Sequence, residues 1–102
     1  MMKLFVVTSL KEYLGDISKI FNQANIHVFS TVDIVGHKQD KPPDLLDDWF
    51  ASGGEDIDSM MIFSFTSEAG ADHGMKLIVD YNKNLKENFP VRAFVLPVER
   101  SV

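Results

Sequence analysis

The sequence contains no cysteine. This absence excludes disulfide bonds, thiolate zinc sites and thiol nucleophiles, since each of them needs a cysteine sulfur. A chain that needs no oxidising compartment suits the reducing cytoplasm, where we expect this protein. A long hydrophobic run is missing at the start, where residues 4–7 are apolar and the polar pair Thr8–Ser9 follows. Such a run is too short for a signal peptide or a membrane span, so direct membrane insertion is not expected.

Basic residues are few, with ten Lys and Arg against 15 Asp and Glu, which gives a net charge of -5. They are scattered along the chain, whereas contacts with phosphate backbones need clustered Lys and Arg, so nucleic acid is not an expected partner. Catalytic patterns are also missing: no Ser-His-Asp order, phosphate-binding loop, carboxylate pair or metal triad can be assembled from the chain. We therefore predict a protein that acts by binding rather than an enzyme.

The chain contains enough apolar residues to form one hydrophobic core. It is 102 residues long and 45% hydrophobic, so a single domain over residues 1–102 can fold without disulfides or metal. An apolar run at residues 3–8 predicts a first strand, and Ser9 with Glu12 fits a capping box that opens a helix ending near Asn25. Helical spacing predicts a buried face for this helix, made of Leu10, Leu14, Ile17, Ile20, Phe21 and Ala24.

Four more elements follow before the chain ends. Between Ile26 and Val35 the period is two, which predicts a second strand with Phe29 and Val35 on the same side. Residues 59–66 predict a third strand, and residues 67–85 predict a second helix with Asp72 near its start. The residues at helical spacing in it are Met75, Ile78, Val79, Asn82 and Leu85. Residues 91–98 predict a last strand, where Pro97 favours a strand end or a sheet edge.

This order predicts an α+β fold, a ferredoxin-like βαββαβ sandwich. Its four-stranded antiparallel sheet would carry both helices on one face, with a long loop over residues 36–58 between the second and third strands. The opposite sheet face would stay uncovered, although Phe29, Val35 and one set of residues from each other strand make it apolar. We expect a homotrimer to hide that face.

Two stretches resemble a known family. Residues 31–39, Thr-Val-Asp-Ile-Val-Gly-His-Lys-Gln, resemble the end of the second strand in nitrogen-regulatory P-II proteins, which leads into that family's long T-loop. Residues 91–100, Val-Arg-Ala-Phe-Val-Leu-Pro-Val-Glu-Arg, are similar to its last strand. The resemblance implies a homotrimeric regulator in signal transduction, with a small effector in clefts between subunits. It also implies that residues 36–58, too long for an ordinary connection, present a mobile loop to a membrane transporter or a regulated enzyme.

The chain departs from the family's pattern at its nucleotide site. The segment before the last strand, residues 84–90, contains no glycine, whereas the family's segment there is glycine-rich, and its basic tail has no counterpart before Val102. The resemblance therefore does not imply ATP binding of the family's usual kind, and the expected effector is an adenine nucleotide held in another way or another anion. The loop holds no tyrosine, so control by uridylylation of a loop tyrosine is not expected.

Arg92 is the strongest candidate for an effector contact, since it stands where the family has a phosphate-contacting lysine. A charge among Val, Ala and Phe needs either a carboxylate, such as Asp33 or Glu99, or an anionic ligand. The expected effector-binding residues are Gly36, Lys38, Gln39, Lys86 and Arg92.

The loop supplies the other candidate sites. Its apolar residues are expected to bind the partner protein, although Trp49 and Phe50 would also be stabilised by packing on their own subunit. These residues are Leu45, Leu46, Trp49 and Phe50. His37 and Asp40 offer ligands to a divalent metal, and the alternative function is a trimeric metal-binding protein similar to the CutA type. A small ferredoxin-like enzyme that uses Arg92 and His37 is a third hypothesis.

Overall fold

The computed structural model describes residues 1–37, 58–85 and 89–102. The elements follow one another in the order strand, helix, strand, strand, helix, strand, as predicted. They are β1 (Met2–Leu10), the 3-10 helix η1 (Lys11–Tyr13), α1 (Leu14–Gln23), β2 (Ser30–Val35), β3 (Asp58–Ser67), α2 (Glu68–Lys83) and β4 (Arg92–Pro97).

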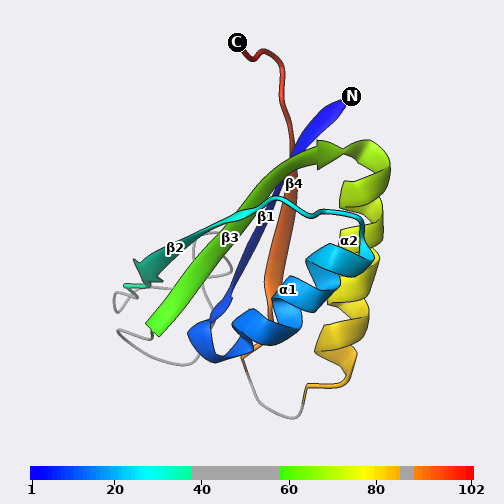
Figure 1. Ribbon diagram of the computed structural model, residues 1–102. Coiled ribbons are helices and arrows are strands. Elements are labelled where there is room, and N and C mark those ends of the chain that lie inside the picture. Colours follow the sequence, from blue (N-terminus) through cyan, green and yellow to red (C-terminus); the bar gives the residue numbers. More distant parts are fainter. Residues whose placement is uncertain (38–57, 86–88) are drawn as a thin grey trace, which may run out of the picture.

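The four strands form one antiparallel sheet in the order β2-β3-β1-β4. Both helices lie on the same face of this sheet, as Figure 1 shows. This arrangement confirms the ferredoxin-like fold. Strand β4 forms one edge of the sheet, and Pro97 is its last residue. The prediction that Pro97 lies at a strand end or a sheet edge is therefore confirmed. Residues 38–57 of the predicted loop lie outside the described residues.

The predicted capping box at Ser9 is wrong. Ser9 belongs to β1, where it pairs with Met60 of β3, and its hydroxyl donates to the carbonyl of Leu10 at 3.1 Å. The strand continues past Ser9 because β3 is long enough to pair with it as far as Leu10. The turn into α1 is made by η1, and neither of these helices has a side-chain cap at its start.

The predicted alternation from Ile26 to Val35 is also wrong in its first half. Asn25 has a positive φ of 63° at the end of α1, and the amide of Ile26 then donates to the carbonyl of Phe21 at 2.8 Å. This turn buries Ile26 and brings the ring of Phe29 to 5.1 Å from that of Phe21. Phe29 therefore belongs to the core beneath the helices. Strand β2 begins only at Ser30.

The strand register corrects the expected composition of the uncovered face. Val35 pairs with Asp58, two residues before Met60, so its position belongs to the side of the sheet that the helices cover. The β2 residues on the opposite side are Ser30, Val32 and Ile34, which share rows with Phe63, Met61 and Ser59.

Helix α2 begins at the start of the predicted segment, but Asp72 is not near its first residue. Ser67 is its N-cap, with a side-chain oxygen that accepts a hydrogen bond from the amide of Gly70 at 3.1 Å. Asp72 instead lies in the second turn, where it is exposed. Serine accepts this bond as readily as aspartate, so the earlier residue, the last one of β3, takes the position.

The core lies between the sheet and the two helices. It contains Phe5 and Phe21, whose ring centroids are 5.3 Å apart, and most of the face predicted for α1. Leu14 and Val79 are exposed, so the predicted buried faces are wrong at these two positions. In α2, Ile78 is buried, and the buried side of this helix also contains the small residues Ala71 and Gly74. A narrow side lets the helix approach the strands closely.

A tyrosine joins the two helices at their outer surface. The hydroxyl of Tyr81 donates to Asp16 Oδ2 at 2.7 Å, and the ring of Tyr13 lies edge-on at 6.1 Å. Burial, followed by the hydrogen bond to Asp16 and its negative charge, raises the pKa of Tyr81 well above the ordinary value of 10.0. The neutral phenol therefore stabilises the fold at pH values below 10.0, and this contribution is lost as the pH rises further.

We expect Tyr81 to ionise later than an ordinary tyrosine when the protein is titrated with base. The difference in phenolate absorbance between the wild type and Tyr81→Phe isolates this group. The same comparison, with and without Tyr81→Phe, can be made in the Asp16→Asn background, which removes the neighbouring negative charge. There Tyr81 should ionise at a lower pH than in the wild type. A Tyr81 that ionises at the ordinary pKa in the folded wild type would contradict the prediction.

Candidate functional site

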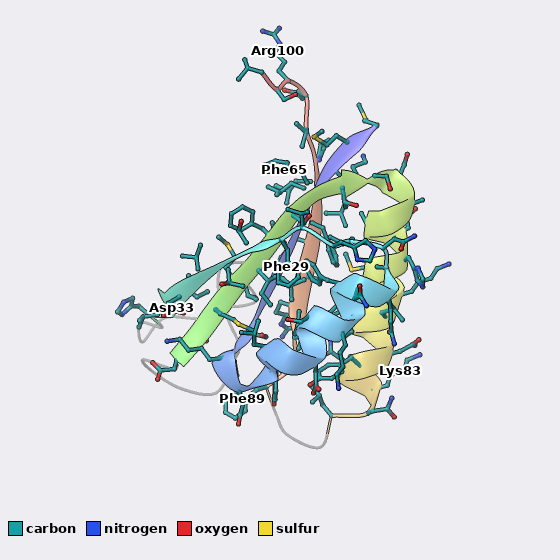
Figure 2. The ribbon with its side chains drawn as sticks, viewed as in Figure 1. Phe29, Asp33, Phe65, Lys83, Phe89 and Arg100 are labelled. Atoms are coloured by element: carbon teal, nitrogen blue, oxygen red, sulfur yellow. The ribbon has the colours of Figure 1, made fainter. Side chains whose placement is uncertain are left out.

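Several candidate residues gather at one end of the sheet, which we call the loop end. Strands β1 and β2 finish there, with Lys11 and Gly36 directly after them, and β3 and β4 begin there, at Asp58 and Arg92. Figure 1 shows this end where the grey traces join the strands. In Figure 2, Asp33 and Phe89 lie toward the loop end and Phe65 lies toward the opposite end, which carries both termini.

Two of the predicted effector residues, Gly36 and Arg92, are placed at the loop end. They lie on opposite edges of the sheet, because β2 and β4 are the outer strands. Three strand spacings of about 4.8 Å separate these edges by about 14 Å. A small anion is too short to touch both residues of one chain. The other three predicted effector residues, Lys38, Gln39 and Lys86, lie outside the described residues.

Arg92 lies on the face of the sheet that the helices leave open. It pairs with Thr8, which is fully buried, and the same row continues to Met61 and Val32. Arg92 itself is partly buried, and its Nε atom is fully buried. A guanidinium in such surroundings is weakly hydrated, which strengthens its attraction to an anion.

The two carboxylates proposed from the sequence as partners of Arg92 are placed elsewhere. Asp33 lies on β2, at the far edge, and forms an ion pair with Lys11 at 3.2 Å. Glu99 is exposed and follows the other end of β4. The sheet order separates Asp33 from Arg92, and an extended strand separates Glu99 from it.

A cavity of about 420 Å³ opens at the loop end. Its lining combines the apolar side chains of Leu10 and Phe89 with charged residues. The charged ones are Lys11, Glu12 and Asp58. Apart from Asp58, which ends the predicted loop, none of these residues was singled out for a site from the sequence, because they come from three separate segments that only the fold brings together.

A second cavity, of about 290 Å³, lies between the end of α1 and the start of α2. Asn25, Ser67 and His73 are among its lining residues. The end of β3 leads directly into Ser67, so this cavity belongs to the opposite end of the sheet from Arg92. His73 is exposed, as is His27.

The metal and partner sites predicted from the sequence depend on the loop. His37 is exposed at the loop end, while Asp40 lies outside the described residues. Within residues 1–37, 58–85 and 89–102, no three His, Asp or Glu side chains gather as metal ligands would. The predicted partner-binding residues Leu45, Leu46, Trp49 and Phe50 are also outside the described residues.

The sheet face opposite the helices, which we call the open face, is rich in apolar side chains. Phe65 is 58% exposed there, and Val32 and Leu96 are also exposed. Phe65 and Leu96 share a row through Leu4, and Phe63 and Phe94 share the next row through Val6. Neighbouring rows of the same face therefore form one continuous apolar surface.

Among the described helices, none combines the length and apolar character needed to cross a membrane.

Solved structures with a similar fold include two PII-like proteins. One is a crystal structure described as a PII-like signaling protein of Thermus thermophilus, with a TM-score of 0.65 and 13% sequence identity over 92% of this chain and 83% of that one. Another is the apo form of CPII from Thiomonas intermedia, a nitrogen regulatory PII-like protein, with a TM-score of 0.66 and 12% identity over 92% of this chain and 85% of that one.

Comparisons by sequence give a different result. No family model matches the chain, and no curated protein matches it. The likeness is therefore one of backbone arrangement, which persists after sequence identity has fallen to this level. The chain has the fold of the PII-like signalling proteins, which confirms, at the level of fold, the resemblance seen in residues 31–39 and 91–100.

Proposed function

We propose that this chain is a PII-like regulatory protein that works as a homotrimer. It binds a small anionic effector, such as an adenine nucleotide, in clefts between subunits. It then presents residues 36–58 to a partner protein, such as a membrane transporter or a regulated enzyme. This is a binding function, in which the effector favours one conformation of the presented segment over another.

The placement of Gly36 and Arg92 is the observation that carries this proposal. They share the loop end of the sheet but lie on its two opposite edges. In the proposed trimer, an effector touches both residues where the β2 edge of one copy lies beside the β4 edge of another. A contact between two different surfaces of the same chain is heterologous, and when the rotation closes, such contacts form a ring. A trimer is the smallest ring of this kind.

The open face supports the same assembly. An antiparallel sheet that keeps one face in water normally alternates apolar and polar residues, so that the wet face is polar. Here the open face instead exposes Val32, Phe65 and Leu96. Continuous apolar patches of this kind mark association surfaces on folded proteins. Covering each open face with the other copies would remove these side chains from water.

Calorimetric titration with ATP, ADP, AMP, bicarbonate and divalent metals tests the proposal. Binding of one of the anions, at one site per chain, is the expected result. Binding of metal alone, without any anion, would favour the metal-binding alternative. A protein that binds none of these probes would contradict an effector site of the proposed kind.

Arg92→Ala is expected to weaken binding of the anionic probe by about tenfold to a hundredfold, because a charge-assisted hydrogen bond contributes about 1.5–3 kcal/mol. The affinity measured by calorimetry, beside a cooperative thermal unfolding curve, checks this result. Lys83→Ala is the matched control, since Lys83 is exposed at the end of α2 and its ion pair with Asp80 is long, at 4.0 Å. Equal affinities for the wild type and Arg92→Ala would remove Arg92 from the site.

A further inference from the structure

We infer that Asn82 is a positioning residue for the effector site, and that its side-chain amide fixes the start of β4 so that Arg92 emerges on the open face. Asn82 lies in the last turn of α2. Its Nδ2 donates to the carbonyl of Val91 at 2.8 Å, and the amide of Val91 donates to its Oδ1 at 2.8 Å. This inference rests on the proposed function, in which Arg92 contacts the effector.

The two hydrogen bonds satisfy the backbone amide and carbonyl of Val91, as pairing with a neighbouring strand would do. A primary amide carries both an acceptor and donors, so one side chain satisfies both backbone groups of a residue. Val91 is 2% exposed and precedes the first pair between β4 and β1, which is Arg92 with Thr8. Buried backbone groups need hydrogen-bond partners, and here Asn82 provides them outside the sheet ladder.

Fixing Val91 also fixes the direction of the next side chain. Successive side chains of a strand point to opposite faces, and Val91 contributes to the core beneath the helices. Arg92 must therefore point to the open face. A slip of one residue at this position would exchange the two side chains, which would bury the guanidinium and expose the valine. The Asn82 amide holds the chain against such a slip at the point where β4 begins.

The bonds also span a short segment of chain. Asn82 and Val91 are nine residues apart, and the segment between them returns from α2 to the sheet. Pinning its far end reduces the number of positions that Arg92 can occupy before an effector arrives. Preorganisation of this kind improves affinity because less order has to be created on binding.

A double-mutant cycle with ATP as the probe tests the inference. Asn82→Ala is expected to weaken ATP binding on the order of tenfold in the wild type, but to change nothing further in Arg92→Ala, because both act through the same contact. Asn82→Asp keeps the acceptor for the Val91 amide and loses the donor, so we expect a smaller loss. Asn84→Ala is the matched control, since that side chain bonds only the exposed end of its own helix, at the carbonyl of Asp80.

The outcomes separate this inference from the proposed function. If Arg92→Ala weakens ATP binding while Asn82→Ala and Asn82→Asp leave it unchanged in folded protein, the positioning role is overturned and the effector site stands. If Asn82→Ala lowers only the unfolding midpoint, its role is structural and the inference is again overturned. If wild-type protein binds no ATP and no other anionic probe, the proposed function fails and the inference falls with it.

Discussion

Phe65→Asp is expected to convert the assembly from three chains to single folded chains. Phe65 is 58% exposed in the isolated subunit, so the substitution removes little packing from the fold itself. In a trimer that covers the open face, the same position becomes buried, and an unpaired carboxylate there costs several kcal/mol per copy. Three copies per assembly multiply this cost. Static light scattering measures the result as a fall in molar mass from three chains to one.

Two further variants make this test specific. Leu96→Asp changes a residue that shares a row with Phe65 through Leu4, and it is expected to give the same dissociation. Val79→Asp introduces the same charge at a similarly exposed apolar residue of α2, outside the open face, and the mass of three chains should remain. A wild type that scatters as a single chain would contradict the assembly. So would Phe65→Asp at the mass of three chains.

The sequence predicted the architecture because most of its signals are local. Apolar runs and helical spacing recur within ten or twenty residues, and they located four strands and two helices in the right order. The errors lie where a long-range contact overrides a local one. Ser9 fits a capping box, but its pairing with Met60 keeps it in the sheet. Phe29 fits an alternating strand, but its packing against Phe21 draws it into the core.

The candidate site was predictable only in part. Arg92 was visible because a charge within an apolar strand is unusual, and Gly36 because it ends the second strand within a family-like motif. Their separation across the sheet followed only from the strand order. In the sequence, Asn82 was only one position of a predicted amphipathic helix. Its two hydrogen bonds to Val91 join a helix to the start of a strand, and no helical or strand periodicity in the sequence relates these two residues. Polar contacts of this kind depend on tertiary structure.

Gly74→Ala is expected to destabilise the protein, although alanine is the better helix former. A Cβ built on Gly74 lies 2.8 Å from Cε2 and 2.9 Å from Cζ of Phe5, so the substituted side chain would overlap the ring. That ring is fully buried and packs against Phe21, which leaves it no room to move. Overpacking costs about 1–3 kcal/mol, and the gain in helix propensity offsets only about 1 kcal/mol of it.

Gly15→Ala supplies the matched control for this substitution. Gly15 lies in α1, and a Cβ built there has no neighbouring atom within 4 Å, so only the propensity gain of about 0.5–1 kcal/mol remains and the protein should become more stable. Urea unfolding midpoints at one fixed protein concentration compare the two variants, since the stability of an assembly depends on concentration. Gly74→Ala with a midpoint as high as that of Gly15→Ala would contradict the close approach of α2 to β1.

The Phe5→Leu background shows whether the overlap with the ring is the cause. Leucine lacks the outer ring atoms that the new methyl would meet, so Gly74→Ala should be neutral or stabilising there, with a coupling energy of about 1–3 kcal/mol. The result also bears on the effector site, because Gly74 and Asn82 belong to the same helix. If α2 is displaced from the sheet in Gly74→Ala, the Asn82 amide moves with it and Val91 loses its hydrogen bonds. Gly74→Ala should then weaken binding of the anionic probe as well. In the Phe5→Leu background, Gly74→Ala should lower neither that binding nor the stability.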